Sequence, residues 1–499
     1  MIDFSIILAG FSDAFTLWNL VFVLFGVVVG HLVGAVPGIG PVMAMAIAIP
    51  FTFGFDTLPA IAFLVGVNKG GLVSGAVPAV LINTPGTPDA AATALDGYPL
   101  ARQGKPLKAT KMALFSSVTG DTFSDIVLIT VSAPLAILAL RMGPVEVLAL
   151  MIFAFSVLSG LVGKSFLKGV IAATLGLLFA TVGADPENYN PRLIFGHYEL
   201  YDGLPLVSVA IGMLAMSEII RRLSEIHGEV KSAVSVQDAG NRNDQRVTWK
   251  EYWSCRYTML RGAGMGTILG ALPGIGSTAA AFLSYSTTKA LSTKPETFGK
   301  GNLQGIAAAE SANSAVVGAN LIPLLTLGIP GSVSAALIIS AFMIHGIQPG
   351  PLLFQDQGRL IYGLFGTMIM ANFLNLWVGQ LGLRIWVKVV SAPESIIFSS
   401  AILLCIVGVG MATNGLFGVV VMLIFAVIGY LMTSAGLSVV IFIITFFLGS
   451  RFEISLSQSL ALMNADITRI VEYPIALALL ALSVASVIWF LTRNREKSI

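Results

Sequence analysis

Residues 63–106 read FLVGVNKGGLVSGAVPAVLINTPGTPDAAATALDGYPLARQGKP. The stretch begins as apolar as a membrane helix, yet it carries Asn68, Lys69 and Ser74 inside the apolar run. It then breaks at residues 83–88, Asn-Thr-Pro-Gly-Thr-Pro, where proline removes a backbone donor and glycine permits conformations that a helix cannot hold. At membrane depth such a break is tolerated only where the freed N–H and C=O groups line a protein-enclosed cavity. The stretch therefore predicts a binding site built on a broken helix.

The composition of the whole chain is that of a membrane protein. Its 499 residues are 56% hydrophobic and 11% charged, with a mean hydropathy of +0.88, whereas charged residues make up about 25% of soluble proteins. Apolar stretches near the roughly 20 residues that a spanning helix needs recur along the chain and predict an all-α polytopic membrane protein. They lie at about 17–36, 41–53, 60–82, 112–140, 144–162, 166–184, 203–220, 258–275, 278–291, 305–327, 360–383, 394–410, 415–433, 436–449 and 473–491.

Two motifs of the first half recur in the same order in the second half. Residues 30–40, GHLVGAVPGIG, reappear at 266–276 as GTILGALPGIG, an offset of 236 (266 − 30). A second set recurs at an offset of 245 (313 − 68), and this shared order predicts an internal duplication. The matched residues are Asn68 with Asn313, Pro78 with Pro323, Pro85 with Pro330, Gly86 with Gly331 and Pro106 with Pro351.

The placement of basic residues indicates that the two halves are inverted. Lys and Arg concentrate in cytoplasmic loops, and in the first half they cluster at 102–111 and 164–168, whereas the matching positions 346–358 and 411–414 have none. The basic central segment and the basic C-terminal tail should be cytoplasmic, and the acidic loop 185–202 and the N-terminus should face outward. The predicted organisation is a first transmembrane repeat at 1–220, a cytoplasmic linker at 221–257, a second, inverted repeat at 258–450, and a C-terminal transmembrane helix with its tail at 451–499.

In inverted-repeat transporters the sites lie near the midplane, where the broken helices of the two halves meet. Half-helix N-termini present free N–H groups to an anion, and unwound carbonyl groups can coordinate Na⁺. The substrate-binding candidates are Asn68, Lys69, Ser74, Asn83, Thr84, Gly86, Thr87, Asn313, Ser314, Asn320, Thr326, Gly331 and Ser332. The ion-coupling candidates are Pro37, Gly38, Gly40, Pro273, Gly274, Gly276, Asp89 and Glu310. Asp96, Asp121 and Asp125 could equally carry a coupling proton or bind Na⁺, or lie at an interface.

Each of these features also has a plainer interpretation. A lysine inside an apolar span costs about 2.5–3.5 kcal/mol at the bilayer centre, so Lys69 could balance the charge of a substrate, but it could also extend its side chain to an interface. Small-residue runs such as Gly70-Gly71 could be helix-packing faces. The Pro-Gly breaks could be simple loops, and His31 and His345 are expected to be packed or interfacial.

The sequence lacks the complete motifs that would indicate an enzyme or a channel. The sequence has no HExxH zinc motif, and residues 160–165, GLVGKS, resemble the end of a P-loop but have Leu158 where the first glycine is required. Cys255 and Cys405 form no metal or redox motif, and the net charge of +2 does not suggest nucleic acid as a partner. The absence of a TVGYG filter weakens a channel hypothesis. A transporter that is not an enzyme, with no cofactor beyond a coupling cation, is therefore expected.

The motif set resembles that of a known family. Residues 34–41 (GAVPGIGP), 83–88 (NTPGTP), 96–100 (DGYPL), 270–276 (GALPGIG) and 328–331 (GIPG) are similar to the large membrane subunit of the tripartite tricarboxylate transporters, over nearly the whole chain. The resemblance implies a bacterial inner-membrane secondary transporter that works with a small membrane subunit and a periplasmic solute-binding protein. It implies uptake of carboxylates such as citrate, coupled to a gradient of Na⁺ or H⁺.

An elevator motion is expected by analogy with other carboxylate carriers. In it the break-bearing regions 63–90 and 310–335 would move against the remaining helices while the site alternates between the two sides of the membrane. The other hypotheses are a carboxylate channel or exporter without ion coupling, a membrane-embedded enzyme and an assembly scaffold. The inverted duplication favours transport over these.

Overall fold

A computed structural model describes residues 4–36, 40–161, 165–225, 245–389, 394–413 and 415–496. Most of these residues are helical, and the strands among them form one antiparallel pair, β1 (Gly183–Ala184) and β2 (Pro191–Arg192). Within this described part, seven helices are long and apolar enough to cross a membrane. The all-α polytopic fold class predicted from composition is confirmed.

The helices begin at residues that favour helix starts. A short polar side chain caps an N-terminus when it accepts a backbone N–H from the first turn of the helix. Five helices begin in this way, after Thr16, Ser165, Asn302, Ser332 and Ser438. The helices of the first half are α1 (Phe4–Ala14), α2 (Leu17–Gly34), α3 (Gly40–Ala48), η1 (Ile49–Gly54), α4 (Thr57–Ser74), α5 (Ala76–Ile82), α6 (Ala90–Arg102), α7 (Pro106–Ala139), α8 (Pro144–Leu161), α9 (Phe166–Ala180), η2 (Tyr198–Leu200), α10 (Leu206–Ile211), η3 (Gly212–Met216) and α11 (Ser217–Glu225).

The second half contains helices of similar order and length. They are α12 (Trp249–Ser254), α13 (Arg256–Ala271), α14 (Gly276–Leu291), η5 (Pro295–Thr297), α15 (Leu303–Ala319), α16 (Leu321–Leu327), α17 (Val333–Ile344), α18 (Leu353–Asp356), α19 (Gly358–Val389), α20 (Glu394–Ala412), α21 (Leu416–Ser434), α22 (Val439–Leu462), η6 (Ile467–Glu472) and α23 (Pro474–Glu496).

Glycines spaced four residues apart let helix backbones approach closely in both halves. On α2, Gly30 faces Val67 of α4, and a Cβ there would overlap the Val67 carbonyl oxygen. On α13, Gly266 meets Ala312 of α15 in the same way. These are the pairs of positions that the two sequence offsets relate. The small-residue runs therefore serve as helix-packing faces, as one of the sequence interpretations proposed.

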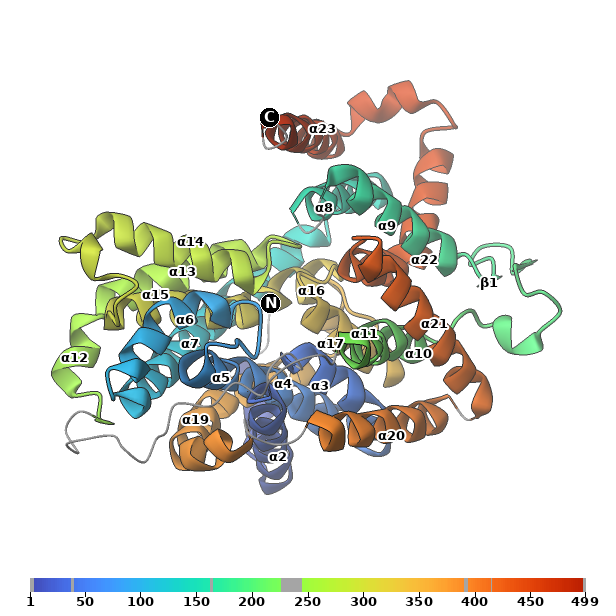
Figure 1. Cartoon of the computed structure of the whole chain (residues 1–499). Helices are drawn as coiled ribbons and strands as arrows, with labels where there is room; N and C mark the ends of the chain where they lie inside the picture. Colours follow the sequence, from blue (N-terminus) through green and yellow to red (C-terminus); the bar gives the residue numbers. More distant parts are fainter. Residues whose placement is uncertain are drawn as a thin grey trace.

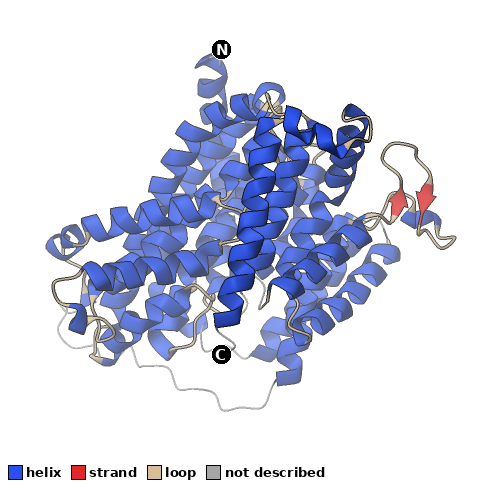
Figure 2. Ribbon diagram, turned by 90° about the horizontal axis from the view of Figure 1, so that it is seen from above, coloured by secondary structure: helices blue, strands red, loops and turns tan. Residues whose placement is uncertain are grey.

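The long helices cross between the halves. Helix α7 packs along α15, and α19 packs against α2 and α4, so each broken helix meets the long helix of the other half. In Figure 1, α13, α14 and α15 lie beside α6 and α7 on the left, while α8, α9 and α22 lie together on the right near the β1–β2 hairpin. The start of α1 and the end of α23 lie at opposite ends of the view in Figure 2.

Three helices differ from the predicted spans. Helices α6 and α17 follow the two breaks, are 13 and 12 residues long, and lie outside the predicted spans. Helix α22 continues to Leu462, although its span was predicted to end at residue 449, because single charged residues do not end a helix. The predicted boundary between residues 450 and 451 therefore falls inside α22.

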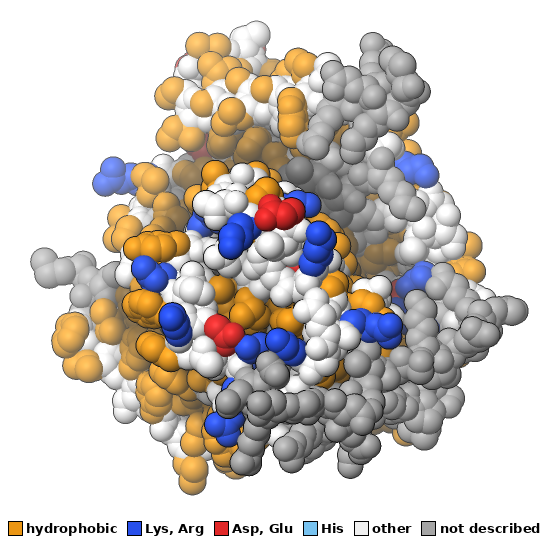
Figure 3. Space-filling model, turned by 60° about the vertical axis from the view of Figure 1, so that its left-hand side comes forward, with side chains coloured by type: hydrophobic (Ala, Val, Ile, Leu, Met, Phe, Trp, Pro, Cys, Tyr) orange, Lys and Arg blue, Asp and Glu red, His pale blue; other side chains and the backbone are white. Residues whose placement is uncertain are grey.

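Segments predicted to be cytoplasmic lie together. Gln103 Nε2 donates to the Lys300 carbonyl at 2.7 Å, and Lys108 Nζ lies 2.6 Å from Glu251 Oε1. These contacts join the turn between α6 and α7 to the loop after α14 and to α12. Figure 3, with the left-hand side of Figure 1 brought forward, shows Lys and Arg side chains gathered on one face. Which side of the membrane this face contacts stays a prediction.

Candidate functional site

The first break lies between α5 and α6 and turns the chain back onto the end of α4. Asn83 ends α5 in the left-handed conformation, with φ of 53°, which Asn tolerates better than most residues. The N–H of Gly86 donates to the Gly75 carbonyl at 3.1 Å, and a Cβ on Gly86 would not fit between Gly34 and Gly75. Helix α6 then begins directly after Asp89. The break is therefore a tightly packed turn rather than a loose loop.

The second break, between α16 and α17, begins in the same way as the first. The seven-residue helix α16 matches α5 at the offset of 245, and Gly328 ends it in the left-handed conformation, with φ of 69°. Here the polar groups bond to one another. Asn320 Nδ2 donates to Ser332 Oγ at 2.8 Å, Ser332 caps α17, and the N–H of Gly274 donates to the Gly331 carbonyl at 3.0 Å.

Buried polar atoms without partners gather where the first break meets α15. The carboxylate of Asp89 faces Thr87, Asn313 and Ser277. Thr87, Asp89 and Asn313 are at most 3% exposed. The side chains of Thr87, Asn313 and Ser277 are close enough to act on Asp89. No hydrogen bond of normal geometry is nevertheless made by Thr87 Oγ1, Asp89 Oδ2, either amide atom of Asn313 or Oγ of Ser314, the next residue on α15. Because buried polar atoms in folded proteins are nearly always paired, such a group of oxygens points to a ligand.

Glu310 adds a second carboxylate to this place. It lies one turn before Asn313 on the same face of α15, and its charge acts on that of Asp89. Glu310 Oε1 accepts a hydrogen bond from Thr93, and Oε2 accepts one from Ser117 at 2.7 Å. No Lys or Arg of the described residues pairs with either carboxylate. Asp89 and Glu310, hereafter the acidic pair, are thus buried without a cation.

Lys69 belongs to a different cluster. Its ammonium donates to Asp125 Oδ2 at 2.7 Å and to Asn372 Oδ1 at 2.8 Å, and it lies 3.1 Å from Asp121 Oδ1. Asn372 Nδ2 donates back to Asp125 Oδ2 at 2.8 Å. These four residues, hereafter the Lys69 cluster, are almost fully buried and join α4 to α7 and α19.

The structure corrects the interface placement that the sequence suggested for Lys69, while its role in substrate binding stays a prediction. Its side chain is 0% exposed, so it does not extend to an interface. Its charge is matched by Asp121 and Asp125, so in this structure it does not face an open site where it would balance a substrate. Lys69 is instead the cation that makes two buried carboxylates tolerable.

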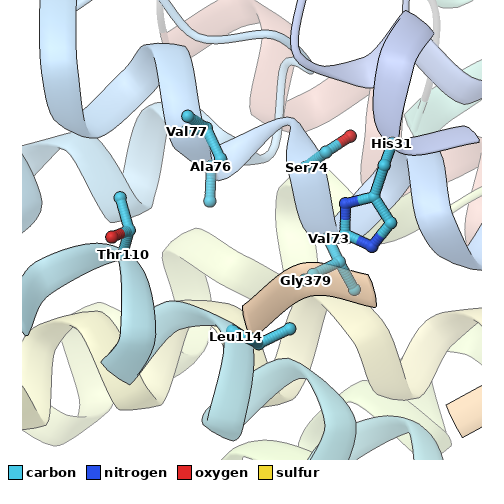
Figure 4. Close-up of a pocket in the computed structure, with 8 residues that line it drawn as sticks. All are labelled: His31, Val73, Ser74, Ala76, Val77, Thr110, Leu114 and Gly379. Carbon is cyan, nitrogen blue, oxygen red and sulfur yellow. The ribbon is translucent and has the colours of Figure 1, made fainter. Parts of the chain in front are cut away.

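Ser74 lies away from the acidic pair. Its Oγ is within hydrogen-bond distance of the carbonyl oxygens of Gly30 and Gly71, at 3.4 and 3.3 Å. With His31 it lines a recess of about 10 Å³, drawn in Figure 4, which is close to the volume that one water needs and too small for a carboxylate substrate. His31 Nε2 lies 2.9 Å from Asn375 Oδ1, so His31 is packed, in line with the expectation from the sequence.

The remaining substrate-binding candidates are dispersed. Asn68 is buried in α4, and Asn83 is exposed. The hydroxyls of Thr84 and Thr326 donate to carbonyl oxygens of their own chain segment, at 3.3 and 2.7 Å. Of the substrate list, Thr87 and Asn313 lie beside Asp89 of the acidic pair, and Ser314 is the buried residue that follows Asn313 on α15.

The other predicted ion-coupling residues lie in two Pro-Gly-Ile-Gly segments, residues 37–40 and 273–276. Pro37 and Gly38 lie outside the described residues. Gly40 begins α3 with φ of 64° beside Gly86 and Thr87. In the second loop, Pro273 and Gly274 precede Gly276, which begins α14 directly before Ser277. This second loop therefore borders the acidic pair.

Asp96 has a structural role in this conformation. Its Oδ1 accepts the N–H groups of Gly299, Gly301 and Asn302 at 2.8–2.9 Å, and its Oδ2 accepts the Tyr285 hydroxyl at 3.0 Å. Both carboxylate oxygens are therefore used to anchor the loop after α14 onto α6.

Sequence reasoning did not single out Thr93, Ser117, Ser277 or Asn372. Hydroxyl and amide side chains are common in membrane helices, and only the contacts across the two halves distinguish these four. Among the described residues, no three His, Cys, Asp or Glu side chains gather as ligands for a metal ion.

Comparison with known proteins identifies the family. Residues 20–444 match the model of the tripartite tricarboxylate transporter TctA family. The chain belongs to this family. It is 34% identical over 479 residues to the "Uncharacterized 52.8 kDa protein in TAR-I ttuC' 3'region" of Agrobacterium vitis, covering 96% of this chain and 94% of that protein.

A second relative from the same organism is the "Uncharacterized protein in TAR-II ttuC' 3'region", 35% identical over 223 residues, which are 45% of this chain and 92% of that protein. No solved structure matches the chain significantly. TctA-family membership confirms the resemblance read from the motifs and makes the chain a transporter subunit. Together with its seven apolar helices it identifies a multi-pass membrane protein.

Proposed function

We propose that this TctA-family chain carries out secondary active, cation-coupled uptake of carboxylates such as citrate and other tricarboxylates. The family supports a tricarboxylate transporter. The observation that supports coupling to a cation is the acidic pair at the first break. Its two buried carboxylates have no Lys or Arg partner among the described residues, and Thr87 Oγ1 and the amide atoms of Asn313 beside them make no hydrogen bond of normal geometry.

The chemistry of the acidic pair favours Na⁺ as the coupling ion. Buried carboxylates are paired with a cation or bind a metal ion, since an isolated charge in the interior is very costly. A proton would need only one carboxylate oxygen. Thr87 Oγ1, Asp89 Oδ2 and Asn313 Oδ1 together offer several unpartnered oxygens, which are the ligands that alkali cations take.

A cation here would act on an anion bound at the second break through α15. Asn313 and Asn320 are seven residues apart, so they lie on one face of this segment and about 10 Å apart along it. Asn313 belongs to the cation site and Asn320 to the second break. A bound cation would lower the cost of bringing a multiply charged anion out of water, and the two solutes would bind cooperatively.

The Lys69 cluster bears on the transport motion. Separating Lys69 from Asp121 and Asp125 would leave buried charges unpaired, which costs about 3–5 kcal/mol. We therefore propose an elevator-type motion in which α7 and α19 move together with α4. This differs from the motion expected from the sequence, in which only the break-bearing regions move.

The partners and orientation follow from the family and the charge pattern. The chain would work with a small membrane subunit and receive substrate from a periplasmic solute-binding protein at the bacterial inner membrane. The N-terminus would be periplasmic and the C-terminus cytoplasmic, which the basic face around α12 supports (Figure 3). The inverted orientation of the two repeats belongs to this same proposal.

Uptake into proteoliposomes tests the proposed function. The chain, its small partner and the binding protein would be assayed with labelled citrate and other carboxylates, with Na⁺ and pH gradients imposed separately. We expect accumulation driven by the Na⁺ gradient, and its loss in Asp89→Asn. Asp356→Asn, at an exposed carboxylate at the end of α18, is the matched control and should accumulate substrate as the native chain does. Accumulation driven only by a pH gradient would assign the role to H⁺, whereas downhill flux indifferent to both gradients would point to a channel or an uncoupled exporter.

A further inference from the structure

The second break is bordered by an arginine from outside both break-bearing regions. Arg451 lies in the apolar helix α22, and its guanidinium lies against Gly328 and Gly350. A Cβ on Gly328 would overlap Nη1, and one on Gly350 would lie 3.6 Å from Nη1 and 3.9 Å from Nη2. Both glycines have positive φ, 69° and 145°. The guanidinium therefore fits beside the second break because two glycine positions leave room for it.

This arginine has no partner among the described residues. It makes no hydrogen bond and no ion pair with them. No charged group of these residues acts on its guanidinium, and burial is the one effect that its surroundings have on its charge. The nearest carboxylate along the helix, Glu453, is bound to Arg192, with Nη2 to Oε2 at 2.9 Å. Lys69, by contrast, has two carboxylates and an amide. A half-buried guanidinium without a counter-charge in an apolar helix is costly, so it is a candidate for binding an anion.

We infer that Arg451 binds a carboxylate group of the transported substrate at the second break. The inference rests on the proposed function. The planar guanidinium fork matches the two oxygens of a carboxylate, which a lysine ammonium does not. Helix α17 begins five residues after Gly328, and its N-terminal end also favours negative charge. Anion and cation would then occupy different breaks of the same chain.

The position of Arg451 suits capture from the outer side. Glu453 is two residues further along α22, and its ion pair with Arg192 joins α22 to the β1–β2 hairpin, part of the loop 185–202 that is predicted to face outward. Two residues of helix span only about 3 Å. Arg451 would therefore be among the first groups of the membrane subunit that an arriving anion meets.

Two measurements on the same variants test this inference. The first is the apparent KM and maximal rate for labelled citrate in proteoliposomes that contain the complete transporter. The second is the shift of Tm that citrate causes in the purified chain in detergent. The variants are Arg451→Gln, Arg451→Lys and, as the matched control, Arg359→Gln, which removes an arginine that is exposed and paired with Asp13.

We expect Arg451→Gln to raise KM by about tenfold or more, to lose the citrate-induced Tm shift and to keep the Tm measured without citrate. Arg451→Lys should fall between Gln and the native chain, because it keeps the charge without the fork, and Arg359→Gln should behave as the native chain does. An unchanged KM in Arg451→Gln would overturn the inference. A lower Tm without citrate combined with a native citrate shift would also overturn it, because Arg451 would then have only a structural role beside Gly328.

The test still decides if Arg451→Gln does not fold or if the native complex shows no uptake. If Arg451→Gln does not fold, Arg451→Lys decides, and an unchanged KM there overturns the inference. If the native complex shows no gradient-driven uptake, the proposed function fails, while the citrate-induced Tm shift still tests Arg451 on its own.

Discussion

Two pairs of buried carboxylates in this protein have opposite environments. Asp121 and Asp125 share the ammonium of Lys69, whereas Asp89 and Glu310 have no Lys or Arg among the described residues. Both pairs are buried, and an unpaired charge in the interior is costly. The first pair therefore carries its own cation as part of the fold, whereas the second has none among the described residues, and we propose that it receives one.

The largest expected effect comes from removing the resident cation. Lys69→Met should lower the free energy of unfolding by about 3–5 kcal/mol, because Asp121 and Asp125 would stay buried without a partner. Thermal unfolding of the purified protein in detergent measures this. The triple variant Lys69→Met, Asp121→Asn, Asp125→Asn should recover most of the loss. If Lys69→Met alone is as stable as the native chain, the Lys69 cluster is not what joins α4 to α7.

A second prediction compares the same substitution in the two pairs. Asp125→Asn should destabilise the protein by about 1.5–3 kcal/mol, since it removes a charged acceptor of Lys69 and of Asn372. Asp89→Asn, measured in Na⁺-free buffer, should leave stability unchanged or raise it, because it removes a charge that has no partner. Equal destabilisation by both variants would mean that Asp89 already has a resident counter-charge, and the comparison would break down.

The smallest effect is expected at the second break. Asn320→Ala removes one hydrogen bond to Ser332 and should cost about 1 kcal/mol. Because Asn320 lies outside the acidic pair, the response of stability to Na⁺ should not change. Ser332→Ala in the Asn320→Ala background then measures the coupling between the two side chains. A changed Na⁺ response would show that the cation site extends to the second break.

The positions of the two helix breaks can be predicted from the sequence, whereas the contacts between side chains that are distant along the chain cannot. Pro-Gly pairs at 85–86 and 330–331 locate both interruptions because these residues act locally on the backbone. The partners of Lys69 were not predictable, since Asp125 is 56 residues away along the chain and Asn372 is 303 away. Asp89 and Asn313 were each proposed as site residues, but only the packing of α6 on α15 brings them together.

Arg451 was not predicted as a site residue, for a different reason. The fall in hydropathy after Gly449 looked like the end of a span, so the charge appeared to lie outside the membrane helix. Helix α22 continues through it to Leu462, because a helix is held by backbone hydrogen bonds that a charged side chain does not remove. A charged residue just past an apolar run therefore deserves consideration as part of the helix.

The most direct test of the account is the thermal stability of the purified chain in NaCl against choline chloride, at fixed ionic strength and pH. The account predicts that Na⁺ raises the Tm of the native chain, corresponding to about 2.7 kcal/mol when its concentration is 100 times the Kd. It also predicts that Asp89→Asn loses this response while Asp356→Asn keeps it. A native chain whose Tm is indifferent to Na⁺, or an Asp89→Asn variant that responds as the native chain does, would contradict a Na⁺ site at the first break.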